Sequence, residues 1–267
     1  MHDIHSGFQD VNQTTQADLF FQFLDAANAL ESIQDYRQRM LELVPTTPGQ
    51  YILDVGCGLG HSALHLAQLV GPTGRVVGLD KSEAFIDEAR RRAAKHSLPV
   101  EYQLGDAQRL AFPAHSFDVC RTERVLMYVA QPEQVLDEMV RVLRPGGALI
   151  LYEFDYDGMV VDAPDQLFTR QITRLIANSV PSGWIGRQAA RLLRQRGLCE
   201  ITVMPRMVLT PYAMYRRVVS GTLDQAVQEG RLGSTEVAAW WGALERAASA
   251  GEFFAGFQGF VVSGRLT

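Results

Sequence analysis

The feature that most constrains the fold is a glycine-rich segment, Leu53-Asp-Val-Gly-Cys-Gly-Leu-Gly60, between two runs of different periodicity. The apolar run 51–55 has the length of a buried strand, whereas residues 62–70 have helical spacing. A tight turn from strand to helix favours residues without a Cβ, because their backbone amides can approach a bound ligand closely. The segment therefore predicts a strand–turn–helix unit with a ligand at the turn. Any nucleotide-binding turn, or a plain tight connection, would fit this segment too.

The alternation of short apolar runs and helical spacing continues to about residue 153. Four further runs are predicted to be buried strands: 75–79, 100–104, 117–120 and 148–152. Ser82 can cap one intervening helix and Pro132 can start another, which Pro145-Gly-Gly147 is expected to end. A repeat of this kind builds a parallel sheet with helices on both faces. We therefore expect an α/β fold with a doubly wound, mostly parallel sheet.

Helical segments flank this repeat on both sides. The residues from Gln16 to Val44 keep helical spacing with one break. Four elements are expected after residue 153: helices at 165–180 and 186–196, then strands at 199–203 and 257–262. The two strands bring the sheet to seven. Residues 211–250, between them, have helical spacing and are expected to form a mobile lid.

Composition and cysteine usage exclude several classes of protein. Lys and Arg number 25 against 30 Asp and Glu, which gives a net charge of −5 and makes a large nucleic-acid surface unlikely to form. Cys57, Cys120 and Cys199 are far apart and odd in number, so neither a disulfide framework nor a zinc site is indicated. The histidines, including His2 and His5, lack metal-ligand spacing. No apolar run is long enough to span a membrane, and we expect a cytoplasmic protein without a metal.

Two carboxylates are placed to bind a nucleoside. Asp80 follows the second predicted strand, about 20 residues after Gly60, where a carboxylate can accept both hydroxyls of a ribose. Asp106 follows the third strand and could receive an adenine amino group. Each has a plainer interpretation, since Asp80 can cap a helix and Asp106 can be an exposed loop carboxylate.

Together these segments resemble the class I S-adenosylmethionine-dependent methyltransferases, in particular the ubiquinone/menaquinone C-methyltransferases. The resemblance covers about residues 51–153 and the final strand pair. It rests on the order and spacing of five segments: 52–60, Val77-Gly-Leu-Asp80, Gly105-Asp-Ala107, Phe117-Asp118 and Leu143-Arg-Pro-Gly-Gly147. After Gly56 and Gly58 the third glycine comes one place earlier than in the dinucleotide pattern, which disfavours an NAD-dependent oxidoreductase.

The resemblance implies a Rossmann-like methyltransferase fold. We expect residues 1–48 to form an N-terminal helical lid segment and 49–267 the methyltransferase domain, in which 210–252 is a helical cap insertion. The resemblance also implies which residues bind S-adenosylmethionine. Asp54 and the turn would hold its aminocarboxypropyl part, Asp80 its ribose and Asp106 its adenine. The full predicted set is Asp54, Gly56, Gly58, Gly60, Asp80, Lys81, Asp106, Ala107, Arg121 and Thr122.

Three residues at the carboxyl ends of the strands are candidate general bases: His61, Glu123 and Glu153. A base is needed only if the acceptor is a hydroxyl or a carbon acid. His61 can equally pack or cap a helix, Glu123 can pair within its loop or grip a polar substrate, and Glu153, with Asp155 and Asp157, can be a solvated edge. Trp184, Trp240 and Trp241 fit an acceptor pocket less well than they fit the core.

The sequence therefore predicts S-adenosylmethionine-dependent methyl transfer to a small organic acceptor of natural-product or quinone type. Oxygen is favoured over carbon or nitrogen as the methylated atom. The alternatives are a cofactor-binding protein with a non-methylating activity, such as a cyclase, or a binding partner. The expected partner is a small molecule and neither nucleic acid nor a membrane; a homodimer is left open.

Overall fold

The glycine-rich segment begins the central sheet of the structure, a computed structural model that describes residues 17–267. Strand β1 (Tyr51–Val55) leads through the turn into helix α4 (His61–Val70), as the sequence predicts. The first residues of the expected N-terminal segment, with His2 and His5, lie outside the described residues. Four more strands follow in the repeat: β2 (Arg75–Asp80), β3 (Val100–Leu104), β4 (Phe117–Glu123) and β5 (Leu143–Phe154).

Helices connect these strands and extend beyond them. Within the repeat they are α5 (Glu83–Ala93), the short 3-10 helix η2 (Leu126–Tyr128) and α6 (Pro132–Val142). After β5 come η3 (Tyr156–Gly158), β6 (Val160–Val161), α7 (Gln166–Ala177), α8 (Ile185–Gln195) and β7 (Leu198–Leu209). The chain ends with α9 (Tyr212–Gln228), α10 (Ser234–Ala250) and β8 (Ala255–Leu266).

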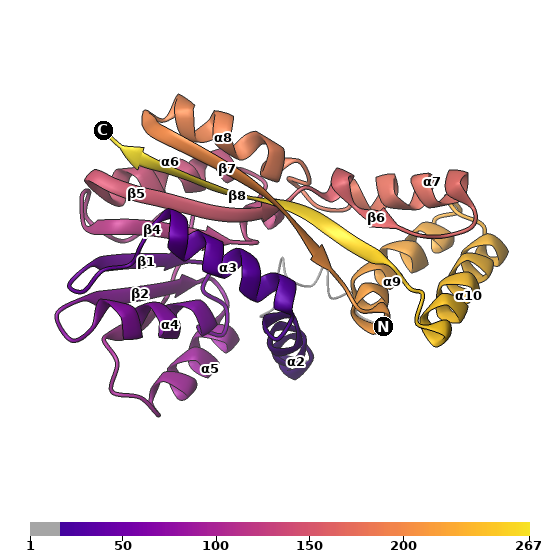
Figure 1. The fold of residues 1–267 in the computed structure, drawn as a ribbon, viewed down its shortest axis with the longest axis horizontal. Helices are drawn as coiled ribbons and strands as arrows, with labels where there is room; N and C mark the ends of the chain where they lie inside the picture. The colour runs from indigo at the N-terminus through magenta and orange to yellow at the C-terminus, as the bar shows by residue number, and fades with distance from the viewer. Residues whose placement is uncertain (1–16) are drawn as a thin grey trace.

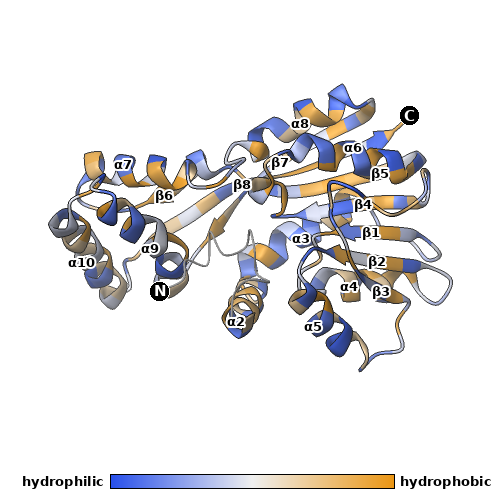
Figure 2. Cartoon of the chain, turned by 180° about the vertical axis from the view of Figure 1, so that it is seen from behind, coloured by the Kyte–Doolittle hydropathy of each residue, from blue (hydrophilic) through white to orange (hydrophobic). Residues whose placement is uncertain are grey.

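The order of the strands creates a crevice at the centre of the sheet. The path runs β3-β2-β1-β4-β5-β8, with β1 to β5 parallel and β8 antiparallel to β5. The chain moves outward from β1 in one direction and from β4 in the other, so right-handed crossovers place α4 and α6 on opposite faces. Figures 1 and 2, seen from opposite sides, show this arrangement. The carboxyl ends of β1 and β4 therefore border the point where ligands bind in such sheets.

The sheet has eight strands among the described residues, not the seven expected from the sequence. The additional strand is β6, whose Val160 pairs with Gly256 of β8. Strand β8 is longer than the stretch of β5 that pairs with it, so its first residues remain available to the chain beyond η3. A strand of two residues carries no detectable periodicity.

Helix α6 ends just before the Pro145-Gly-Gly147 segment, but the next strand begins earlier than the expected residue 148. The helix ends at Val142, and Leu143 is already extended, with ψ 136°. Arg144 precedes Pro145, and a residue before proline is disfavoured in helical conformation. The chain is therefore extended here, and residues 143–147 are the first residues of β5.

Helices α7, α9 and α10 form a second lobe beyond the sheet. Figure 1 shows β7 and β8 running from the sheet into this lobe, where α7, α9 and α10 pack together. Trp240 and Trp241 are buried there, and the indole of Trp240 donates to Thr169 Oγ1 at 3.0 Å, which joins α10 to α7. Trp184 is half exposed beneath the guanidinium of Arg187. The lobe therefore contains the expected 210–252 insertion together with α7, from a separate part of the chain.

The N-terminal helices α2 (Ala17–Asn28) and α3 (Glu31–Leu43) pack their apolar faces against the rest of the chain. The ring of Tyr36 stacks on that of Tyr152 in β5, with centroids 3.7 Å apart. In α9, the guanidinium of Arg217 lies 5.9 Å from the ring centre of Phe23 in α2. Figure 2 shows mainly hydrophobic residues along β2, which α4 and α5 contact, and along β5, which α6 and α8 contact. The N-terminal segment and the second lobe thus meet over the crevice.

Two glycines with the same backbone conformation test how tightly the turn is packed. Gly60 has φ +79° and a Cβ there would meet the Tyr102 ring, whereas Gly146 has φ +77° and nothing within 4 Å. We expect Gly146→Ala to cost about 1 kcal/mol of unfolding free energy, from the left-handed backbone alone. Gly60→Ala should cost a further 1–3 kcal/mol, roughly, because the ring must move. Urea unfolding measures both; equal losses would contradict the packing argument.

Candidate functional site

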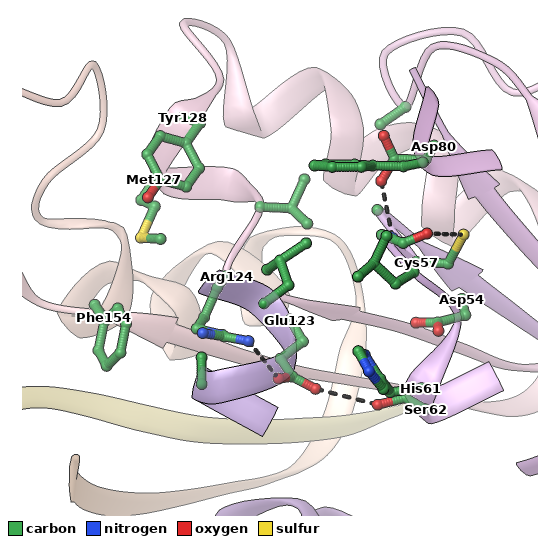
Figure 3. A pocket seen from close by; sticks show the side chains of 18 of the residues that line it. Asp54, Cys57, His61, Ser62, Asp80, Glu123, Arg124, Met127, Tyr128 and Phe154 are labelled. Carbon is green, nitrogen blue, oxygen red and sulfur yellow. Dashed lines mark hydrogen bonds and ion pairs between the residues drawn. The ribbon is translucent and has the colours of Figure 1, made fainter. Parts of the chain in front are cut away.

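A cavity of about 290 Å³ lies at the carboxyl ends of the parallel strands. The glycine-rich turn and the ends of β2 and β4 form one part of its lining. Helices α2 and α3 cover it with Phe23, Leu24 and Ile33, and α9 contributes Met214 and Val218. The cavity therefore has one end on the strand–turn–helix unit and another on α9 of the second lobe. Figure 3 shows the side chains of the glycine-rich turn and of the ends of β4 and β5 from close by.

Asp80 is fixed in the cavity wall by backbone amides. Its Oδ2 accepts from the Gly58 amide at 2.9 Å, and its Oδ1 accepts from the Ser82 amide at 3.0 Å. A carboxylate has about four lone pairs, so the two oxygens can accept from a ligand in addition to these amides. Burial raises the pKa of Asp80, while these amides oppose the rise. The side chain is thus positioned to accept two hydroxyl groups.

Asp54, at the end of β1, has an unsatisfied oxygen. Its Oδ1 accepts from Arg121 Nη1 at 3.0 Å, but its Oδ2 is buried without a hydrogen-bond partner among the described residues. Burial raises the pKa of Asp54 to about 6, although the charge of Arg121 opposes the rise. A buried acceptor without a donor costs about 1–3 kcal/mol, so this oxygen indicates a donor or cation supplied by a ligand.

Most of the remaining residues predicted to bind the cofactor line the cavity, and two do not. Among the described residues, the lining includes Gly56, Gly58, Lys81, Asp106, Ala107 and Arg121. Asp106 Oδ1 accepts from the Gln108 amide at 2.8 Å, which leaves Oδ2 for a ligand. Gly60 and Thr122 are outside the lining; Gly60 precedes α4, and Thr122 is fully buried in β4.

These acceptors together fit S-adenosylmethionine. A ribose diol can donate to the carboxylate oxygens of Asp80, and an amino group matches the unpartnered oxygen of Asp54. Glycine is required at position 56, where φ is +72° and a Cβ would lie 3.2 Å from Cγ1 of Val125. The turn can therefore keep its amides close to a ligand only with glycine there.

Glu123 lies at the centre of a buried charge cluster. Its oxygens accept from Arg37 Nε and Nη2 at 2.8–3.0 Å, from Arg121 Nη2 at 2.8 Å and from the Tyr36 hydroxyl at 2.5 Å. Burial raises its pKa, but the charges of Arg37, Arg124 and Arg121 outweigh burial and hold the pKa well below the usual value. Glu123 is consequently a weak proton acceptor at neutral pH.

His61 lines the cavity and contacts the N-terminal helices. Its Nε2 lies 2.8 Å from Asp25 Oδ1 in α2, and Arg92 Nη1 in α5 donates to the same carboxylate oxygen at 2.7 Å. Burial lowers the pKa of His61, although Asp25 opposes the change. The imidazole is thus neutral near pH 7, a form that can accept a proton.

Glu153 does not line the cavity among the described residues, because its carboxylate faces the backbone of residues 125–127. Its Oε1 accepts from the amides of Val125 and Leu126 at 2.9 Å, and its Oε2 from that of Met127 at 3.4 Å. Burial raises its pKa to about 7 against the effect of these amides. The side chain holds η2 and its neighbours, which do line the cavity. Asp155 and Asp157 instead pair with Arg187 of α8.

The second end of the cavity is mainly apolar. It is formed by Phe154 and Tyr156 after β5, by Val208 and Phe257 of the strands that leave the sheet, and by α9. The rings of Phe154 and Phe257 lie 5.6 Å apart. Trp240 and Trp241 are not among the described lining residues, in agreement with the preferred core interpretation.

Sequence reasoning missed Arg37 and Asp25, which reach the site from helices far away in the chain. A signal existed for Arg37, since it stands on the same helical stripe as the buried residues Ile33, Tyr36 and Met40. A charged residue on an apolar stripe needs a buried partner. The partner, Glu123, could not be identified by spacing.

Residues 17–267 contain neither a helix that could span a membrane nor a cluster of side chains that could bind a metal ion. No helix in that range has the length and apolar character needed to cross a bilayer. No three His, Cys, Asp or Glu side chains in it are clustered so that they could hold a metal ion.

Comparisons with known proteins agree with the geometry. The model of a methyltransferase domain family matches residues 53–151. An uncharacterized 37.1 kDa protein in transposon TN4556 of Streptomyces fradiae is 38% identical, over 92% of this chain and 71% of that protein. The ubiquinone/menaquinone biosynthesis C-methyltransferase UbiE of Ectopseudomonas mendocina is 30% identical, over 67% of this chain and 76% of the enzyme.

Solved structures share the fold. The YcgJ protein of Bacillus subtilis superposes with a TM-score of 0.62 at 18% identity, over 86% of this chain and 97% of that one. The [4+2]-cyclase SpnF superposes with a TM-score of 0.58 at 20% identity, over 97% and 95%. At these identities the likeness concerns the fold alone, which is the expected α/β sheet flanked by helices.

Glu153→Gln separates an anchoring role from a catalytic one. Because the folded-state pKa of about 7 exceeds the ordinary glutamate pKa of 4.5, protonation of Glu153 stabilises the fold at low pH, and this stabilisation is lost as pH rises through 7. Glutamine does not titrate. We expect the wild-type free energy of unfolding to fall by about 2–3 kcal/mol relative to the variant between pH 5 and pH 8.

Urea unfolding across this pH range measures the difference, with Glu245→Gln, an exposed position on α10, as the control that should follow the wild type. A flat difference combined with a large loss of turnover in Glu153→Gln would instead identify Glu153 as a base.

Proposed function

The chain belongs to the class I S-adenosylmethionine-dependent methyltransferases, and from this premise we propose that it methylates a small organic acceptor at an activated carbon. The observation that carries the proposal is a single cavity with two unlike ends. One end offers Asp54, Asp80 and Asp106 to a nucleoside and an amino acid group. The other offers an apolar, aromatic surface of the kind that binds small organic molecules.

S-adenosylmethionine, when bound, supplies a methyl group that is electrophilic because it is attached to a sulfonium. The residues of this chain then act mainly by placement. Asp80 orients the ribose, and Asp54 accepts from or pairs with the amino group. Helices α2, α3 and α9 exclude water from the cavity, which holds the acceptor in line for the transfer.

Carbon is the atom favoured by the relatives. The relative from Ectopseudomonas mendocina is named a C-methyltransferase, and this chain covers 76% of it. The preference for oxygen expected from the sequence is not confirmed, and no side chain of the apolar end argues for it. A quinone-like acceptor in its reduced, hydroxylated form is electron-rich at ring carbon and fits the aromatic surface of Phe154 and Phe257.

A carbon acceptor loses a ring proton after the new C–C bond has formed. Of the three candidate bases, His61 both lines the cavity and is neutral near pH 7. We assign its Nδ1 as the proton acceptor, because Nε2 already bonds to Asp25 Oδ1 and a neutral imidazole that donates through Nε2 accepts through Nδ1. We assign Glu123 to holding α3 in place, because its Oε2 already accepts hydrogen bonds from Arg37 and Arg121. We assign Glu153 to holding η2 in place, because its Oε1 already accepts from the amides of Val125 and Leu126.

Cofactor binding is tested with S-adenosylhomocysteine and Asp80→Ala. Removing two charge-assisted hydrogen bonds to the ribose should weaken binding by about 2 kcal/mol or more, roughly thirtyfold, in isothermal titration calorimetry. Asp87→Ala, on the exposed side of α5, is the control and should bind as the wild type does. Wild-type affinity in Asp80→Ala would place the ribose elsewhere, and stabilisation by NADH alone would support the oxidoreductase alternative.

Methyl transfer is tested with 1,4-naphthohydroquinone and methyl-labelled S-adenosylmethionine under anaerobic conditions. We expect label on a ring carbon, detected by NMR, with release of one S-adenosylhomocysteine per product. His61→Ala should lower kcat by about 100-fold with little change in cofactor affinity. A methyl ether product would establish oxygen as the acceptor. Consumption of an acceptor without S-adenosylhomocysteine would support the non-methylating alternative.

A further inference from the structure

Arg124 stands in the cavity wall with a backbone conformation that few side chains adopt. It follows β4 directly and has φ +57°, in the left-handed region. Its amide donates to the carbonyl of Tyr152 at 2.8 Å, which fixes this conformation. Figure 3 shows Arg124 between Glu123 and Phe154, with Met127 and Tyr128 nearby and Asp54 and Asp80 at the other side of the cavity. The side chain thus borders the apolar end.

The guanidinium of Arg124 is poorly satisfied within the chain. It has five N–H donors, yet its recorded hydrogen bond is one from Nη2 to Glu123 Oε1 at 3.3 Å, and its buried Nε has no partner among the described residues. Arg37 differs, since it makes three hydrogen bonds to Glu123 and another to Asn28. Arg121 bonds to both Asp54 and Glu123.

The carboxylates of the cluster cannot satisfy Arg124 as well. Three guanidiniums, those of Arg37, Arg121 and Arg124, are joined through two carboxylates, those of Glu123 and Asp54. The linked cluster therefore carries one excess positive charge. Each of its five side chains is at most 18% exposed. Asp80 and Asp106, elsewhere in the wall, are directed to backbone amides. A buried cation without a counter-ion is costly, so a ligand anion is the missing partner.

The position of the excess charge decides which ligand supplies the anion. The nucleoside end is at Asp80 and Asp106, whereas Arg124 adjoins Phe154 and the loop held by Glu153. We propose that Arg124 is a specificity-determining residue that binds an anionic oxygen of the acceptor, a carboxylate or an ionised enol, while the apolar body of the acceptor lies against Phe154, Phe257 and α9. The proposal rests on the methyl-transfer function and names the acceptor class as an amphipathic organic acid.

Matched pairs of probes test the charge of the acceptor. We would titrate the complex with S-adenosylhomocysteine by calorimetry, using 2-naphthoate against 2-naphthamide, and 2-hydroxy-1,4-naphthoquinone against its methyl ether. The first pair reports carboxylate recognition and the second reports enolate recognition. At pH 7.5 the anion of at least one pair should bind ten times or more tighter than its neutral counterpart. Equal binding within both pairs would overturn the proposal without any variant.

Substitution then assigns the preference to Arg124. In Arg124→Met the preference should fall to less than twofold, and Arg124→Lys should keep part of it. Affinity for S-adenosylhomocysteine should stay within twofold of the wild type in both, and Arg194→Met, exposed on α8, should keep the full preference.

Three results separate the possible errors. A preference that survives in Arg124→Met would assign the anion to another residue. A parallel loss of S-adenosylhomocysteine affinity in the variant would show that Arg124 binds the cofactor carboxylate, and would overturn the proposal. Failure of the wild type to bind S-adenosylhomocysteine at all would contradict the proposed function instead.

Discussion

The ion pairs between Glu123 and the guanidiniums of Arg37 and Arg121 connect the parts of the site. Glu123 ends β4, Arg37 belongs to α3, and Arg121 continues the connection to Asp54 at the end of β1. Breaking a buried pair by removing one member typically costs about 3–5 kcal/mol, because the other charge is left without a partner. Helix α3 is therefore a fixed wall of the cavity, and the carboxylate of Asp54 is linked to this helix through Arg121 and Glu123.

The sequence was sufficient for those parts of the structure that local rules determine. The glycine-rich turn, the strand–helix repeat and the position of Asp80 all follow from backbone geometry within about 30 residues, and the structure has them as expected. The short strand β6 was missed because it depends on pairing with β8, which is distant in the chain. The start of β5 was missed because the restraint that Pro145 imposes on Arg144 extends the chain before the predicted strand.

The site was harder to predict because distance along the chain hides partners. Glu153 alternates with aromatic residues and looks like an edge carboxylate, but the chain folds η2 over it and supplies three amide donors. Nothing in the spacing of Arg37 or Asp25 relates them to Glu123 or His61. The family model likewise ends at residue 151, before Phe154, Tyr156 and Phe257, so the part of the cavity that faces the acceptor is the part with the least family signature.

Strands β7 and β8 pass without interruption from the sheet into the second lobe. Each is twelve residues long, and the ladder between them extends from Leu198 and Leu266 to Leu209 and Gly256. The register shifts between Cys199 and Thr202 and is regular from Thr202 to Leu209, so the part of the ladder that enters the second lobe joins it to the sheet by unbroken backbone pairing. Helix α2 is attached differently, by its buried apolar side chains Phe20, Phe23 and Ala27 and by Asp25, which is 44% exposed and pairs with Arg92 and His61. Such surface pairs contribute only about 0–1 kcal/mol. Helix α2 is thus held mainly by its apolar face, whereas β7 and β8 join the second lobe to the sheet by backbone hydrogen bonds.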